Sequence, residues 1–296
     1  MASLREIKDH IGSVRSTLKI TGAMKLVASA KLRKAQQEVE GLRPYGSVLG
    51  EILAAIPGSL AAGGNAPEGR GSSGNTVAVV AISGNSSLCG AFNVNVIRRT
   101  QEVLAGLKAE GASPVLFAVG RKMAEAARKW GYPTPVDYNY LVGGHAGFAE
   151  TSLFARALIE GYDEGRFSRV VLVYNHFVSA SSQKVLTETY LPFGAGQPSP
   201  RPGEDAAGPS DHDCEYILEP SGERILSTLL PQVLRLKIHT VLLDSMTAEH
   251  AARAIAMQTA SDNAEDLLEE LSLEYNKGRQ ARITAEILDL AGGAQQ

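Results

Sequence analysis

Residues 4–18, LREIKDHIGSVRSTL, repeat an apolar side chain at alternating intervals of three and four positions. This spacing is typical of a coiled coil, in which one stripe of a helix packs against a second helix. A capping box precedes the repeat, because Ser3 is followed three positions later by Glu6. The pattern therefore predicts a long helix that begins near Ser3 and requires a helical partner. Its apolar positions are Leu4, Ile7, Ile11, Val14 and Leu18.

The repeat continues into ITGAMKLVASAKLRKAQ, residues 20–36, but small and charged side chains now take its positions. Thr21, Lys25 and Ala28 stand where larger apolar residues are expected. Farther along, Pro44 predicts a bend, since proline removes one backbone hydrogen bond of a helix. The helix is therefore expected to be long, weakly apolar in its middle and bent toward its end.

The same region is strongly basic. From His10 to Gln37 the sequence holds six Lys or Arg residues and no Asp or Glu. Such a run most often forms a solvated helix face. Nucleic acid is a second interpretation, although no interleaved aromatic residues or recognition module accompany the run. An acidic protein partner is a third, in which charge steers and orients the approach. The basic residues are Arg15, Lys19, Lys25, Lys31, Arg33 and Lys34.

The C-terminal segment also carries a helical pattern. After Pro231 it has no proline, and Gly278 is the one glycine between Pro231 and Gly292. We expect a helix from the 220s to about Leu290, which is longer than a globular domain requires and must project from it. The small residues toward its end would let a partner helix approach closely. The expected seam positions are Ala264, Leu267, Leu271, Gly278, Ala281, Ala285 and Leu288.

Between these two ends, apolar β-branched runs alternate with helical patterns. This alternation predicts βαβ units and a mostly parallel sheet. A glycine-rich stretch, residues 58–75, predicts a flexible linker before the first strand. The last expected strand alternates polar and apolar residues and is expected to be antiparallel. The expected strands cover 76–83, 114–120, 169–178 and 183–193, and the expected helices cover 92–110, 121–130 and 148–164.

The predicted fold class is α/β. A long antiparallel coiled coil of the N- and C-terminal helices carries a small, mostly parallel, Rossmann-like α/β domain. Residues 1–57 are expected to form the N-terminal coiled-coil helix, residues 76–220 the α/β domain and residues 221–296 the C-terminal helix. Pairing the two ends is economical, because each has a seam that needs a partner.

Motifs for catalysis and cofactor binding are absent from the sequence. It has no GxxxxGK[ST] loop, no strand-linked GxGxxG, no HExxH and no CxxC, so we expect no catalytic residue, bound nucleotide, metal or other cofactor. Cys89, in SGNSSLCGAFN, lies between an expected strand and an expected helix, where active-site loops occur, and is a candidate nucleophile. We favour a buried cysteine in a tight turn, with Gly84 and Gly90 providing conformational freedom.

Bulk composition sets further limits. The chain is 44% hydrophobic with a net charge of −3, so it can bury a core, and any effect of charge must be local. Cys89 and Cys214 make no disulfide framework, which favours a reducing compartment. The N-terminus lacks the apolar region of a signal peptide, and no apolar window is long enough to cross a bilayer.

Both ends of the chain resemble the gamma subunit of the rotary (F-type) ATP synthase. The resemblance is carried by IKDHIGSVRSTLKITGAMKLVASAKLRKAQ (7–36) and EHAARAIAMQTASDNAEDLLEELSLEYNKGRQARITAEILDLAGG (249–293). Shorter matches are SSLCGAFN (86–93), YDEGR (162–166) and EYILEP (215–220). The resemblance implies a central rotor shaft without an active site. Such a shaft transmits torque between the membrane c ring and the catalytic beta subunits, and so couples ion flow to ATP synthesis or hydrolysis.

The resemblance also implies contacts with the beta subunits. Met24 and Lys25 match a shaft segment that lies near an acidic loop of beta. Arg279, Gln280 and Thr284 match residues that hydrogen-bond a catching loop of beta. These five residues are therefore the expected binding residues for the catalytic ring.

A second set of contacts is implied at the opposite end of the shaft. Tyr216 and Glu219 match the family's foot, which meets the c ring and the epsilon subunit. The expected partners are thus the alpha and beta subunits, epsilon and the c ring, with no nucleic acid. The expected location is the cytoplasmic face of a bacterial inner membrane, reached peripherally through the complex.

Two other functions stay open at this point. A cysteine-dependent enzyme would use Cys89 on the α/β domain, and a passive coiled-coil scaffold would bind partners without regard to the orientation of the rod. Periodicity alone does not separate a rotor from a scaffold, whereas the family resemblance favours the rotor.

Overall fold

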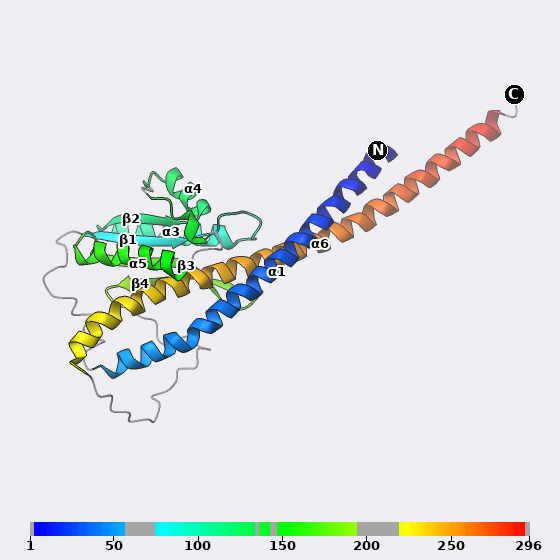
Figure 1. The fold of residues 1–296 in the computed structure, drawn as a ribbon. Coiled ribbons are helices and arrows are strands. Elements are labelled where there is room, and N and C mark those ends of the chain that lie inside the picture. The colour runs from blue at the N-terminus through cyan, green and yellow to red at the C-terminus, as the bar shows by residue number, and fades with distance from the viewer. Residues whose placement is uncertain (1–2, 57–74, 134–135, 143–146, 194–218, 294–296) are drawn as a thin grey trace. The chain divides into compact units, whose positions relative to one another are not determined.

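The computed structural model describes residues 3–56, 75–133, 136–142, 147–193 and 219–293. The chain divides into two compact units. One unit, the helix pair, joins Met1–Ala30 to Arg253–Gln296, and the other, the sheet unit, comprises Lys31–Ala252. The long helices α1 (Leu4–Ala55) and α6 (Gly222–Gly293) each contribute to both units (Figure 1).

The sheet unit is built on a sheet that has four strands within the described residues, in the order β2-β1-β3-β4. β1 pairs in parallel with β2 on one side and with β3 on the other, whereas β4 pairs antiparallel with β3. The prediction of a mostly parallel sheet with one antiparallel strand is confirmed. The strands are β1 (Thr76–Ile82), β2 (Ser113–Val119), β3 (Arg169–Phe177) and β4 (Gln183–Leu191).

Helices cover both faces of this sheet. One face packs against α5 (Phe148–Asp163) and part of α6, and the other packs against α3 (Phe92–Ala109) and α4 (Arg121–Lys129). A short 3-10 helix, Asn139–Val142, contributes to the first layer. β1 is therefore apolar and buried from Val77 to Ile82, because successive side chains enter opposite cores.

The helix pair has a much thinner core. Within the described residues, its main cluster has four buried apolar side chains with half-buried neighbours beside them, and Ala28 and Met257 are buried outside this cluster. Thr21 and Ser261 replace apolar residues near one end, where their hydroxyls hydrogen-bond at 2.8 Å in a buried position. A buried polar pair of this kind specifies the register of two helices. The four buried residues are Ile7, Val14, Ala264 and Leu271.

A second contact gives the same antiparallel register. A Cβ placed on Gly278 would lie 3.0 Å from Leu4, so α1 and α6 approach closely there. Leu4 and Thr21 are 17 positions apart, and so are Ser261 and Gly278. The predicted antiparallel coiled coil is confirmed, and Gly278 is the small residue that allows the close approach.

The expected seam of α6 is wrong in two places. Leu267 is 36% exposed, and its neighbour Leu268 packs into the seam instead. Beyond Gly278, the side chains of Ala281, Ala285 and Leu288 are exposed, because α1 begins at Leu4 and offers no helix to pair with them. α6 thus continues past its partner as a single helix.

Proline does not end either long helix. α1 passes through Pro44 and continues to Ala55, and α6 passes through Pro231. The predicted linker, residues 58–75, lies outside the described residues except for Asn75. The division of the chain into segments 1–57, 76–220 and 221–296 stays a prediction.

Candidate partner-binding site

The first part of the basic run of α1 lies beside acidic residues of α6. Six acidic side chains of α6 lie between positions 262 and 274, and all of them are exposed. The antiparallel register sets this stretch beside residues 8–20 of α1, which carry Lys8, Arg15 and Lys19. Exposed charges of opposite sign attract each other weakly. The helix pair therefore has a mixed surface here, which disfavours the nucleic-acid interpretation. The acidic residues are Asp262, Glu265, Asp266, Glu269, Glu270 and Glu274.

Met24 and Lys25 lie beside the seam and are both half-buried. The register places Lys25, at a seam position, level with Met257, which is buried. A lysine at such a position can pack its aliphatic stem and keep its ammonium group in water. Large apolar side chains in this segment stay open to solvent: the exposed fractions are 59% for Ile20 and 72% for Leu26. This part of the helix pair combines a positive charge with uncovered apolar surface.

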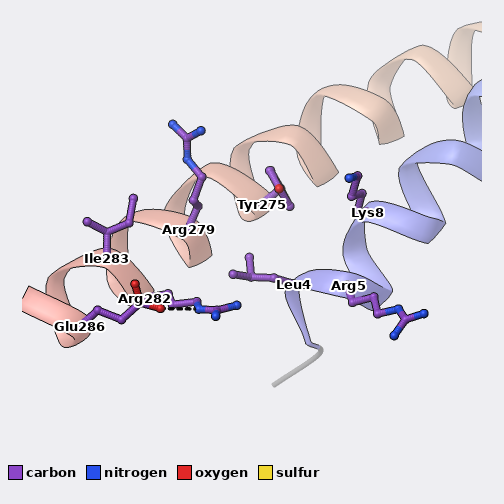
Figure 2. A pocket seen from close by; sticks show the side chains of 8 residues that line it. All are labelled: Leu4, Arg5, Lys8, Tyr275, Arg279, Arg282, Ile283 and Glu286. Atoms are coloured by element: carbon purple, nitrogen blue, oxygen red, sulfur yellow. Dashed lines mark hydrogen bonds and ion pairs between the residues drawn. The ribbon is translucent and has the colours of Figure 1, made fainter.

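A shallow hollow of about 380 Å³ lies where α1 begins against α6 (Figure 2). Arg5 and Lys8 line it from α1, and Arg279 and Arg282 line it from α6. One acid, Glu286, reaches Nε of Arg282 at 2.9 Å. The hollow is therefore positive overall and suits an acidic segment. Its apolar lining consists of Leu4, Tyr275 and Ile283.

The structure separates the three residues predicted near this end. Arg279 lines the hollow, whereas Gln280 and Thr284 do not. Thr284 donates its hydroxyl to the backbone oxygen of Gln280 at 2.9 Å, so these two residues share a neighbouring face of α6. All three side chains are exposed. The sequence prediction missed Arg5 and Arg282, whose roles depend on the pairing of the two helices.

Met24 and Lys25 form a site apart from this hollow. Met257, which is level with Lys25, is 22 positions from Arg279 along α6, a separation of about 33 Å at 1.5 Å per residue. In the sheet unit, Glu219 is exposed beside the start of α6 and lines a second shallow hollow with Arg224. The other residue predicted there, Tyr216, lies outside the described residues.

Comparison with known proteins places these features in a family. The family profile described as ATP synthase matches residues 3–296. The chain is 41% identical over 302 residues to an ATP synthase gamma chain of Bacteroides thetaiotaomicron, covering 100% of both chains. It is 43% identical to a gamma chain of Phocaeicola vulgatus, covering 99% of both. The chain belongs to the ATP synthase gamma chain family.

Solved structures agree with this family in fold. The rotor of the Euglena gracilis mitochondrial ATP synthase contains a chain that matches with a TM-score of 0.60 at 19% identity. That match covers 95% of this chain and 98% of the other. A chain of the Tetrahymena thermophila central stalk and c ring matches with a TM-score of 0.55 at 20% identity, covering 82% of this chain and 99% of the other. The gamma chain fold therefore extends over both units.

Cys89 occupies a structural position in this member of the gamma chain family. Its side chain is 1% exposed and packs with Phe92 and Ala248. The side-chain amide of Asn93 donates to Sγ at 3.1 Å. A thiol enclosed in this way is shielded from substrates. The expected buried cysteine is confirmed, and Gly90 supplies the positive φ of 56° that the turn requires.

The reason for Gly84 differs from the prediction. Its φ is not in the left-handed region, but a Cβ there would lie 2.8 Å from the carboxyl carbon of Glu249. The loop after β1 also satisfies the first amides of α4. Asn85 accepts from the amide of Arg121 at 2.9 Å, and the hydroxyl of Ser83 accepts from the next amide but one, that of Met123, at 2.8 Å. These donors, which in other α/β proteins bind phosphate, are occupied by protein atoms.

The remaining sequence-based expectations concern metals and membranes. Among the described residues, no cluster of three or more His, Cys, Asp or Glu side chains is arranged to hold a metal ion. Within the same part of the chain, no helix combines the length and the apolar character that crossing a bilayer requires.

Proposed function

We propose that this gamma chain is the central rotor shaft of an ATP synthase. It transmits torque between the membrane c ring and the catalytic beta subunits, and it contributes no active site of its own. The full-length similarity to gamma chains carries this proposal. The enclosed thiol of Cys89 and the capped start of α4 support the absence of catalysis on the sheet unit.

The surface of the helix pair suits a shaft that turns inside a ring. A turning shaft has to remake its contacts at each step, so it cannot depend on one fixed apolar socket. Isolated apolar side chains such as Ile20, Leu26 and Val27, set among charges, offer many weak contacts instead of one strong one. Through these contacts the shaft would favour a different conformation in each beta subunit, according to its orientation.

Two segments are proposed to meet the beta subunits. Met24 and Lys25 face an acidic loop of beta, supported by the half-buried position of Lys25 beside uncovered apolar surface. Arg279, Gln280 and Thr284 bond a catching loop of beta, supported by their exposure and by the positive hollow that Arg279 lines.

The foot of the shaft is proposed to include Glu219 and Tyr216, which would contact the c ring and the epsilon subunit. Glu219 is exposed, as such a contact requires. Through these subunits the chain would be peripheral to the cytoplasmic face of a bacterial inner membrane.

The decisive experiment compares ATPase activity of the isolated chain with that of a complex purified through a tag at residues 63–75. We expect no activity from the chain alone and Mg-ATPase from a complex with alpha and beta subunits. Activity of the isolated chain that is lost when Cys89→Ser is introduced would favour the cysteine enzyme. A complex in which α6 can be cross-linked to beta without loss of turnover would favour the passive scaffold.

Charge reversal tests the assigned contacts within such a complex. Arg279→Glu is expected to lower ATP-driven ion pumping more than it lowers ATP hydrolysis, because it reverses a charge in the hollow. Lys277→Glu is the matched control, since Lys277 is exposed on the same turn but does not line the hollow. Equal pumping by both variants would remove Arg279 from the proposed contact.

A further inference from the structure

Within the sheet unit, α6 lies on one face of the sheet and buries apolar side chains there. Leu234, Ile238, Val241 and Leu242 join the core that β1 and β3 share with α5. Such contacts hold the helix on the sheet, but their energy depends mainly on buried area and only weakly on direction. A helix held by them alone resists lifting better than it resists a small rotation or slide.

Two further contacts, a hydrogen bond and a close packing contact, hold the same stretch of α6 at its two ends. Near Leu234, the hydroxyl of Tyr190 on β4 donates to the Leu234 carbonyl oxygen at 3.1 Å. At the far end, the carboxylate of Glu249 packs directly on the backbone of Gly84 after β1. The two contacts are 15 positions apart on α6, which is about 22 Å along the helix.

A first ion pair lies between these ends. Nζ of Lys237 is 3.0 Å from Oε2 of Glu188 on β4. Glu188 is 7% exposed and also accepts the hydroxyl proton of Tyr174 on Oε1 at 3.0 Å. The Glu188 carboxylate is thus held in place by a residue of the sheet as well as by Lys237. Because it is buried, its ion pair with Lys237 is stronger than a pair on the open surface.

A second polar contact, a hydrogen bond between a histidine and a carboxylate, lies two turns farther along α6. Nδ1 of His176 donates to Oδ2 of Asp244 at 2.6 Å, and the Phe177 amide donates to Oδ1 of the same carboxylate at 3.0 Å. Both donors come from the last residues of β3. One carboxylate of α6 is therefore held by a side chain and a backbone amide together, so its position is fixed along the strand and across it.

We infer that Lys237–Glu188 and Asp244–His176, which we name the polar clamp, lock α6 to the sheet and set the torsional stiffness of this joint. The inference rests on the proposed rotor function, because stiffness matters only where the sheet unit passes torque to the shaft. Directional polar contacts at two points along one helix oppose rotation and sliding, which the apolar contacts oppose less. These four residues are positioning residues that act through α6.

The test uses the complete complex, with Asp244→Ala and Lys237→Met made singly and together. Thr240→Val is the matched control, since Thr240 lies between the two clamp positions and its hydroxyl donates within α6 to Leu236 at 2.9 Å. Asp244→Asn is the conservative variant, because its side-chain oxygen can still accept the Phe177 amide. It also decides the outcome if Asp244→Ala does not assemble.

Three measurements report on this joint between α6 and the sheet. Angular fluctuation of a probe on the sheet unit, with the shaft held in the ring, is expected to widen in each single variant and most in the double variant. Hydrogen exchange at Phe177 is expected to speed up about tenfold in Asp244→Ala, the loss of one charge-assisted bond, and less in Asp244→Asn. ATP hydrolysis should stay near that of the unaltered complex while ion pumping per ATP falls.

The inference would be overturned if assembled complexes of the clamp variants had the same angular fluctuation and the same ion pumping per ATP as the Thr240→Val complex. Failure of the unaltered chain to purify with ATPase subunits would overturn the rotor proposal instead. The two failures are distinguishable, because the second appears before any substitution is made.

Discussion

The helix pair and the sheet unit are stabilised in different ways. The sheet unit buries two apolar clusters, one on each face of its sheet, and its central strands have almost no exposed surface. Within its described residues, the helix pair buries six apolar side chains and leaves large ones such as Leu26 and Leu273 in water. The sheet unit is therefore stabilised by its own core, whereas the exposed apolar side chains of the helix pair are available to contact another protein.

The largest expected effect is in the core of the sheet unit. Leu172→Ala should lower the free energy of unfolding by about 2–5 kcal/mol, because the side chain is fully buried and the surrounding core cannot collapse onto the cavity. Leu271→Ala in the seam should cost no more than about 2 kcal/mol, since a two-helix seam closes more readily. Chemical denaturation followed by region-resolved hydrogen exchange measures both, and equal costs would break the contrast.

A smaller effect is expected at the polar position of the seam. Thr21→Ala leaves the Ser261 hydroxyl without its partner and should cost about 1–3 kcal/mol. The double variant Thr21→Val with Ser261→Ala should be near neutral for stability, yet should let the helices shift register. Cross-linking of cysteines placed at positions 14 and 268 reports the register, and an unchanged cross-linking pattern in the double variant would argue against this role.

The smallest effect is a pH dependence confined to the sheet unit. Burial lowers the pKa of His239 below its usual value of 6.5, and Nδ1 pairs with the Thr151 hydroxyl at 2.9 Å. The unfolded chain takes up the proton near pH 6.5, whereas the folded chain does so only at lower pH. Stability is therefore full above about pH 6.5 and falls below it.

The control for this prediction removes the titrating group. His239→Gln should lose the part of the pH dependence that appears as the pH falls below about 6.5. The helix pair, followed by hydrogen exchange at residues 4–21, should respond much less over the same range. Equal responses of the two regions would contradict the assignment to His239.

Much of the fold could be predicted from the sequence, because each element has a strong local signal. The continuous apolar run of β1 predicts a strand buried on both faces, and the heptad spacing that begins at Leu4 predicts a helix buried along one stripe. The structure confirms both predictions. The antiparallel β4 was also predictable from its alternation of polar and apolar residues.

The predictions that were wrong or incomplete concern features that depend on residues far apart in the chain. Leu267 and Leu268 fit a seam almost equally well, and only the register set by Ser261 with Thr21 decides between them. Gly84 is required because the side chain of Glu249, on α6, packs against the loop after β1. The positive hollow is lined by Arg5 from α1 and Arg282 from α6, and no local sequence pattern predicts that these two residues lie at the same site.

The single-helix end of α6 has a consequence for the life of the chain in the cell. Ile283, Ile287 and Leu288 are 46%, 59% and 65% exposed, on a stretch of α6 that no other helix of the described residues covers. A copy of the chain that is not bound in a complex exposes these side chains to other unbound copies and to proteases. We therefore expect surplus copies of the isolated chain to aggregate or to be degraded rapidly.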